Sequence, residues 1–586
     1  MTQRDRGIVA VLSAILVVLA LALAMPTTGS APAVAAASPS PSADIGTGNP
    51  PIYREGVIGA PSSINPLTAR TQADRDLSKL IFSGLVARGP GATYLPDLAS
   101  SWTADPTGRT WTFRLRPGAT WQDGQPVTAD DVVFTVNLIK DPAYRGPLAN
   151  SWREVSVVKL DASTVEFTLD TPITGFLEDA MVGILPQHLL SLTPVTDLAD
   201  SAFSNNPVGS GPFRLVNWDV TSAELVPTGS APGSSGVSPA PSGPASAATA
   251  SPALSSGSPS ASEGSAGSEP VPAIELEFFG DSTSLAAAYR AGSLDAASGI
   301  SPADATALAA LPGSRLLNYP STTFTSVAMN LRPANTATAP AAVRRALLEA
   351  LDRPAMISSV LDGTGRQADS PIPPSSWAFD AGASAPVASN PAAAATALKA
   401  AGWTKGTSGW LAPKAKTAFT FDLLSPDQTS NPIAWATAEL VTSQWQQFGL
   451  KVTHVALAPA DFVARLGAGT FAAALVDVNI GLDPDLYPLL ASSQAVSGGA
   501  NVTGIQDASL DSLLVAARSP GTDAARLAAY SKLQTALVAN PPMLPLFFRD
   551  DPIVLGPRVD GPVIRPLGDP SDRFWDVLTW RLADGR

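Results

Sequence analysis

Few side chains in this chain could carry out covalent chemistry, and their spacing does not favour it. The 586 residues include no cysteine and only two histidines, His188 and His454, which lie far apart in the sequence. A serine hydrolase needs a base beside its nucleophile, and Ser210 stands between Gly209 and Gly211 without the G-x-S-x-G frame. A zinc site needs three or four His, Cys or carboxylate ligands. We therefore read both histidines as packing residues and expect no catalytic site, no metal site and no cofactor.

Two acidic pairs could serve acid–base catalysis, but each has a simpler structural explanation. Asp130 and Asp131 follow Thr128 at a spacing typical of a helix N-cap with acids in the first turn. Asp483 and Asp485 flank a proline, which is typical of a turn. No nucleophile–base pair is visible in the sequence.

The segment Trp111–Asn137 shows which elements must position such residues. Trp111, Phe113 and Leu115 alternate with polar residues, which predicts a half-buried strand. Two glycine-containing turn pairs follow, and Thr128 then begins a predicted helix.

Further along the chain, helix ends are marked by proline and glycine. An Asn-Pro pair predicts a helix start and a glycine its stop. Predicted helices run from Asn390-Pro391 to Gly402, from Asn431-Pro432 to Gly449 and over Asp523–Val538, and predicted strands over Ala223–Pro227, Ala273–Phe279, Lys451–Leu457 and Leu544–Phe548. Helices and strands alternate, so the fold class is α/β.

Length and charge limit the remaining possibilities. A chain of 586 residues is too long for one core and should divide into two or three lobes. Its 37 Lys and Arg against 50 Asp and Glu give a net charge of −13. An acidic chain without a basic cluster repels phosphate backbones, so we expect no nucleic-acid partner.

The N-terminal segment predicts export. Arg4 and Arg6 precede the apolar run Ile8–Met25, and small residues follow. We interpret residues 1–37 as a signal peptide or an uncleaved signal anchor, and residues 38–50 as a disordered tether. The chain lacks a cysteine for lipid attachment, so we expect membrane association only through this segment. The Ser-, Gly-, Ala- and Pro-rich tract 228–272 is predicted to be a disordered insert.

Five segments in a fixed order resemble one known family. Trp111–Asn137 is similar to the signature of family 5 extracytoplasmic solute-binding proteins, the oligopeptide-, dipeptide- and nickel-binding receptors of ABC importers. Four further segments resemble the same family: Ile64–Gly89, Asn206–Trp218, Val327–Gly365 and Ala397–Trp403. Together they are far more specific than one motif alone.

The resemblance implies a bilobed type II periplasmic-binding-protein-like fold with an additional inserted lobe. Lobe I would comprise residues 51–89, 206–322 and 541–586, lobe II residues 90–205, and lobe III residues 323–540. The ligand would lie between lobes I and III.

The resemblance also implies where the ligand touches the chain. Peptide-binding relatives place an arginine four residues after the position of Phe471 and an aspartate near the end of the same run. This chain has Leu475 and Ile480-Gly481 there, which weakens the case for a peptide ligand. We expect these cleft residues: Asn65, Thr68, Asp477, Asn479 and Asp483, with Trp377 and Trp435 as apolar walls. For Asn65 the alternative is an Asx turn, and for the tryptophans it is core packing.

The function implied is capture of a small solute, either a peptide or another small organic molecule, and its delivery to an ABC permease. No G-x-x-x-x-G-K-[ST] loop is present, so the ATPase is a separate subunit. We expect an exported monomer, periplasmic or at the outer face of the cytoplasmic membrane. The alternative is a surface sensor or adhesive protein on the same scaffold; an enzyme comes third.

Overall fold

The strand and helix expected around Trp111–Asn137 are confirmed by the computed structural model of the chain, which describes residues 51–89, 93–149, 151–172, 175–228, 268–270, 273–496 and 498–583. Strand β5 (Thr110–Leu115) buries Trp111, Phe113 and Leu115 on one face. Helix α3 (Ala129–Lys140) follows N-cap Thr128, whose backbone N–H donates to the Asp131 carboxylate at 2.8 Å. This reciprocal capping explains the acidic pair without catalysis.

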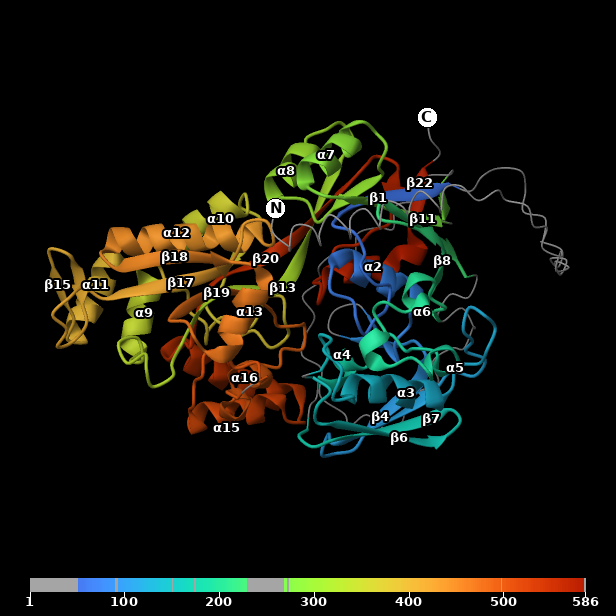
Figure 1. The fold of residues 1–586 in the computed structure, drawn as a ribbon, viewed down its shortest axis with the longest axis horizontal. Helices are drawn as coiled ribbons and strands as arrows, with labels where there is room; N and C mark the ends of the chain where they lie inside the picture. The colour runs from blue at the N-terminus through green and yellow to red at the C-terminus, as the bar shows by residue number, and fades with distance from the viewer. Residues whose placement is uncertain are drawn as a thin grey trace, which may run out of the picture. The chain divides into compact units, whose positions relative to one another are not determined.

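The largest sheet in the described part of the chain has eleven strands. In spatial order they are β18 (Lys451–Leu457), β17 (Thr420–Pro426), β19 (Ala473–Asn479), β13 (Arg315–Met329), β20 (Met543–Leu555), β12 (Ala296–Ser298), β1 (Ile52–Ile58), β11 (Ala273–Phe279), β9 (Ser222–Pro227) and β8 (Phe213–Trp218), with β14 (Arg366–Gln367) paired to β20. The long strands β13 and β20 lie in the middle of this order (Figure 1). Their register shifts between Pro320 and Phe324 and again at Thr325, and such irregularities bend a strand pair.

A separate four-stranded sheet lies within residues 99–169. Its order is β4 (Ala99–Ala104), β5, β7 (Thr164–Leu169) and β6 (Val155–Asp161), with α3 packed on β6 and β7 (Figure 1). One hydrophobic core joins this sheet to β1, β8 and β9, and two others lie within residues 324–548. The three-lobe division stays a prediction.

Helix boundaries follow the predicted capping residues closely. Helix α11 (Pro391–Ala400) begins after Asn390, and α12 (Pro432–Phe448) after Asn431, each with the asparagine oxygen accepting a backbone N–H. Gly449 ends α12 at φ +104°, which a residue with a Cβ rarely adopts. Helix α16 (Asp523–Ala539) also matches its prediction. The other described helices are α2 (Gln72–Ile81), α4 (Phe176–Asp179), α5 (Gln187–Leu190), α6 (Ala202–Asn205), α7 (Ser282–Arg290), α8 (Pro302–Ala309), α9 (Ala341–Glu349), α10 (Arg353–Val360), α13 (Pro459–Ala468), α14 (Tyr487–Leu490), α15 (Ala508–Arg518) and the 3-10 helices η1 (Val195–Asp197), η2 (Ser492–Gln494) and η3 (Pro570–Thr579).

The predicted signal (1–37) and tether (38–50) lie outside the described residues. So does the predicted insert 228–272, apart from Thr228 and β10 (Ser268–Pro270). For β10 the prediction of disorder is wrong, because its backbone pairs with β22 (Arg581–Ala583). The remaining small strands are β2 (Val86–Arg88), β3 (Tyr94–Pro96), β15 (Thr404–Gly406), β16 (Gly409–Leu411) and β21 (Val559–Asp560). Within the described ranges, no helix has the length and apolarity needed to cross a bilayer.

A buried ionic cluster fastens η3 to β1 and α2. Arg573 donates to Glu55 at 2.8 Å and, through two nitrogens, to both carboxylate oxygens of Asp76 at 2.6 Å. Glu55 and Asp76 have no exposed surface, and Tyr53 donates its hydroxyl to Glu55 at 2.7 Å. Two carboxylates hold the pKa of Arg573 above its usual value despite burial. The cluster fixes two elements that line the cavity described next.

Candidate functional site

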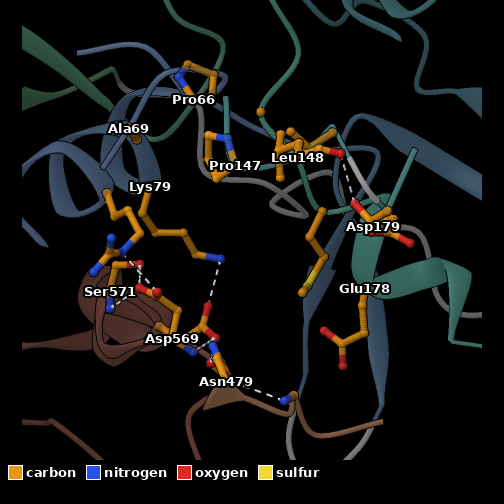
Figure 2. A pocket seen from close by; sticks show the side chains of 18 of the residues that line it. Pro66, Ala69, Lys79, Pro147, Leu148, Glu178, Asp179, Asn479, Asp569 and Ser571 are labelled. Carbon is orange, nitrogen blue, oxygen red and sulfur yellow. Dashed lines mark hydrogen bonds and ion pairs between the residues drawn. The ribbon is translucent and has the colours of Figure 1, made fainter. Parts of the chain in front are cut away.

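A cavity of about 710 Å³ lies where five distant segments meet. They fall within residues 66–82, 147–152, 175–183, 479–488 and 568–572. Figure 2 shows Lys79, Asp569 and Ser571 on one side of this cavity, and Glu178 and Asp179 on another. The volume is typical of pockets that bind small molecules, about 300–1,000 Å³.

Acidic side chains outnumber basic ones in the wall of the cavity. Its described lining includes six carboxylates, Glu178, Asp179, Asp483, Asp485, Asp569 and Asp572, and two cations, Arg75 and Lys79. Whether the wall attracts a cation depends on how these carboxylates are paired.

The two cations of the wall are both held by η3. The Arg75 Nε lies 3.0 Å from Asp569, and the Lys79 Nζ lies 3.0 Å from Asp572. Burial alone would raise the pKa of Asp572, but Lys79 and Arg88 hold it below its ordinary value. Asp569 also caps η3, accepting the Ser571 N–H at 2.9 Å. These pairs join α2 to η3 and its N-cap on one side of the cavity.

Three further carboxylates are paired with arginines behind the wall. Arg526 lies 2.9 Å from Asp483, and Arg518 lies 2.9 Å from Asp485. Arg88 pairs with Glu178. Burial raises the pKa of Asp485 in spite of Arg518.

Asp179, at the end of α4, is the sixth carboxylate. The structure gives it no ion pair with any described residue. Burial raises the pKa of Asp179 to about 6; a hydrogen bond with Ser151 and the charge of Arg518 lower it, and Asp485 raises it.

Two of the residues expected from the sequence, Asn479 and Asp483, line this cavity. Asn479 ends β19, where its Oδ1 accepts the Thr322 hydroxyl at 2.6 Å and its Nδ2 donates to the Gly568 carbonyl. The backbone therefore fixes this exposed amide at the rim.

Asn65 and Thr68 do not line the cavity, although Pro66 and Ala69 do. Asn65 is fully buried, accepts the Leu67 N–H at 3.0 Å and donates to Ser204. This is the Asx turn weighed as its alternative. The Thr68 hydroxyl bonds to Ser63 at 2.8 Å.

Trp377, expected as an apolar wall, does not line the cavity and instead packs against Arg526, which the sequence did not single out. The Arg526 guanidinium lies 4.3 Å from the centre of the Trp377 ring, and Tyr530 packs edge-on at 5.3 Å. Arg526 also pairs with Asp483, so Trp377 holds the guanidinium of Arg526 in place beside that carboxylate through a cation–π contact.

Asp477 and Trp435 lie elsewhere. Asp477 accepts from Thr325 at 2.6 Å and Asn431 at 3.0 Å, and lies 3.5 Å from Arg549. Asn431 and Arg549 line a second cavity of about 810 Å³ beside α12 and β20. Trp435 packs against His454, with ring centres 6.1 Å apart.

The structure brings together a serine, a histidine and a carboxylate that the sequence keeps apart. The Ser425 Oγ lies 2.7 Å from His454 Nε2, and Glu439 contacts His454 Nδ1. Ser425 has no exposed surface and donates its hydroxyl to the Pro426 carbonyl at 2.7 Å. A substrate cannot reach this serine, so the trio is packing, as expected for His454.

The other suspected chemistry has structural explanations too. His188 lies 2.8 Å from Asp123 near the start of α5. A Cβ on Gly209 would stand 1.9 Å from the Ile81 carbonyl oxygen, so close approach of the backbone requires this glycine beside Ser210. Among the residues with described positions, no group of three or more His, Asp or Glu is placed to hold a metal ion.

Sequence reasoning missed Lys79, Glu178, Asp179, Asp569 and Asp572 as wall residues. The pattern Asp569-Pro570-Ser571-Asp572 does signal a helix N-cap with proline at its first turn. Nothing in the sequence signals Asp179, because it lies on a four-residue helix without periodicity.

Comparisons with known proteins agree on one family. The model of bacterial extracellular solute-binding proteins, family 5 middle region, matches residues 93–499. Protein XP55 of Streptomyces lividans is 30% identical over 512 residues, which is 86% of this chain and 85% of that protein.

Two solved structures share the fold. The oligopeptide-binding protein AppA of Bacillus subtilis, in complex with a nonapeptide, has a TM-score of 0.71 at 23% identity and covers 91% of this chain and 99% of its own. NikZ of Campylobacter jejuni, in complex with Ni(L-His), has a TM-score of 0.69 at 23% identity, with 90% and 99% covered.

Proposed function

The chain belongs to the family 5 bacterial extracellular solute-binding proteins, and from this premise we propose that the 710 Å³ cavity is where it holds its solute. Proteins of this family are the substrate-binding components of ABC importers and not enzymes. This chain therefore acts outside the cytoplasm, captures a small ligand and delivers it to a membrane permease.

The observation that supports the proposed site is that segments far apart in the sequence form its walls. Residues 66–82 and 175–183 form one part of the wall, and residues 479–488, which follow β19, form another. Only the fold brings them together. A solute that touches both parts binds best when they are close, so it shifts the population toward a closed form. We assign the bending to β13 and β20, whose pairing is irregular beside the sheet's centre.

We infer that the solute is a small organic molecule that need not be a peptide. Leu475 is fully buried in β19, and Gly481 lines the cavity with φ +78° and no side chain. Neither can supply the charges expected for the two ends of a peptide. The relatives' ligands, a nonapeptide and Ni(L-His), indicate that one fold accommodates different solutes.

We further propose that the protein works as a monomer and that the apolar run 8–25 holds it at the outer face of the membrane when it is not cleaved. Native mass spectrometry of protein isolated from its host tests this together with the ligand. A mass without residues 1–37 would contradict the anchor, and a dimer would contradict the monomer.

The site itself is tested by Asn479→Ala. The substitution removes the amide and its hydrogen bonds to Thr322 and Gly568 at the rim. Binding of the co-purified solute should weaken about tenfold, which corresponds to the loss of one polar contact of about 1.4 kcal/mol. Titration calorimetry measures it. Asn205→Ala, at an exposed position of α6 outside the cavity, is the matched control and should bind as the wild type does. Unchanged affinity in Asn479→Ala would place the solute elsewhere.

A further inference from the structure

Asp179 differs from the other carboxylates of the cavity in its charge balance. Glu178, Asp483, Asp485, Asp569 and Asp572 each lie within ion-pair distance of a lysine or arginine. Asp179 lines the same wall with no such partner in the described part of the chain. Its negative charge is stabilised by a hydrogen bond with Ser151 and by the charge of Arg518, but no ion pair with a described residue neutralises it.

No neighbouring cation is free to turn toward Asp179. Arg88 is held by Glu178 on the same helix, and Arg518 by Asp485. Lys79 lies across the cavity and points to η3 (Figure 2). Compensation has to come from a group that enters the cavity.

Asp179 lies where two segments of the wall approach each other. A Cβ on Gly175, at the start of α4, would lie 3.5 Å from the Asp483 carboxylate carbon. Arg153 donates to the Gly498 carbonyl at 3.2 Å, which is a second contact between the chain at residues 147–183 and the chain at residues 479–498. Asp179 and Asp485 line the same cavity, and the negative charge of Asp485 raises the pKa of Asp179. Because they belong to different segments, repulsion between these two charges opposes closure of the wall.

From this geometry we propose that Asp179 binds a protonated amine or guanidinium group of the solute, and that this group lies between Asp179 and Asp485. The inference rests on the proposed function and adds the class of solute: an organic cation. Hydrogen bonds from a cationic donor to a carboxylate are about twice as strong as neutral ones. The cation also removes the repulsion between the two segments, so recognition and closure occur together. A neutral analogue would leave the partly buried carboxylate unpaired and should be rejected.

Two probes with the same backbone test the charge requirement: tri-alanine amide, which carries a protonated amine, and N-acetyl-tri-alanine amide, which is neutral. At neutral pH the wild type should bind the cationic probe at least about tenfold more tightly in titration calorimetry. Asp179→Asn should abolish that preference, and Asp179→Glu should keep it. Asp200→Asn removes an exposed carboxylate outside the cavity and should behave as the wild type does.

Three results would overturn the inference: equal affinity of the wild type for both probes, an unchanged preference in Asp179→Asn, or no binding of the cationic probe at millimolar concentration. Failure of the proposed function looks different. A neutral solute that co-purifies with the protein would contradict the proposal that the solute is a cation but would leave the receptor function standing. Binding of the solute outside this cavity would contradict both the proposed site and the cation.

Discussion

At the scale of single residues, the unpaired carboxylate of Asp179 should make the empty protein less stable than it could be. Its pKa is raised to about 6 by burial, against about 3.9 for an unfolded aspartate. Between these two values the folded chain binds more protons than the unfolded chain. Stability therefore rises as pH falls from about 6 to about 4, and the cost of the charge is present in full above about 6.

Asp179→Asn should accordingly raise the free energy of unfolding at neutral pH by about 1–2 kcal/mol, less than the full shift implies because the side chain is partly exposed. The gain should shrink toward about pH 4. Asp485 adds to the shift of this pKa, whereas the hydrogen bond with Ser151 and the charge of Arg518 oppose it. Urea unfolding at several pH values measures the effect. Asp200→Asn, being exposed, should show no pH-dependent gain; an equal gain there would mean that net charge alone is responsible.

At the scale of elements, Arg573 of η3 is the cation that pairs with the buried acids of β1 and α2. Arg573→Ala leaves Glu55 and Asp76 buried without a cation and should cost about 3–5 kcal/mol. Thermal and denaturant unfolding measure the loss. Arg214→Ala removes an exposed arginine from β8 and should change stability by no more than about 0.5 kcal/mol. Similar losses in both variants would contradict the role of the cluster.

The elements were the part of this structure that local sequence patterns could predict. Asn390, Asn431 and Gly449 mark helix ends through their own backbone bonds and conformations, so their signal is local. That Asn479 and Asp483 line the cavity could be predicted, because Asn479 ends and Asp483 closely follows a strand that the family resemblance placed at the ligand.

The rest of the site depends on contacts between distant segments. Asn65 can form an Asx turn whether or not a ligand is near, so the sequence around it could not show that its side chain does not line the cavity. The pKa of Asp179 is raised mainly by burial in the folded chain, and it is adjusted by Asp485 and Arg518, more than 300 residues away in the chain. Ser425 likewise meets His454 only because β17 and β18 are paired.

At the scale of the whole molecule, the proposal of closure can be tested by a disulfide that joins the two wall segments 175–183 and 479–488. An ideal Cβ on Gly175 lies 3.8 Å from the Asp483 Cβ, close to the mean Cβ separation of about 3.8 Å in disulfides. The chain has no cysteine, so Gly175→Cys with Asp483→Cys introduces the only pair. Oxidation should slow solute exchange at least about tenfold, because the two segments can no longer separate. Stopped-flow release measures the rate, and reduction should restore it.

The single variants, Gly175→Cys and Asp483→Cys, control for loss of the aspartate and for the added side chain. Neither should respond to oxidant. Unchanged exchange in the oxidised double variant would mean that solutes enter without separation of these segments.

The union of Glu55, Asp76 and Arg573 also bears on secretion. Glu55 and Asp76 precede their counter-ion Arg573 by 518 and 497 residues in a chain that acts outside the cytoplasm. Before Arg573 is in place, packing of β1 and α2 would bury the carboxylates of Glu55 and Asp76 without a cation. We therefore expect β1 and α2 to complete their packing only after residue 573 is available outside the cytoplasm.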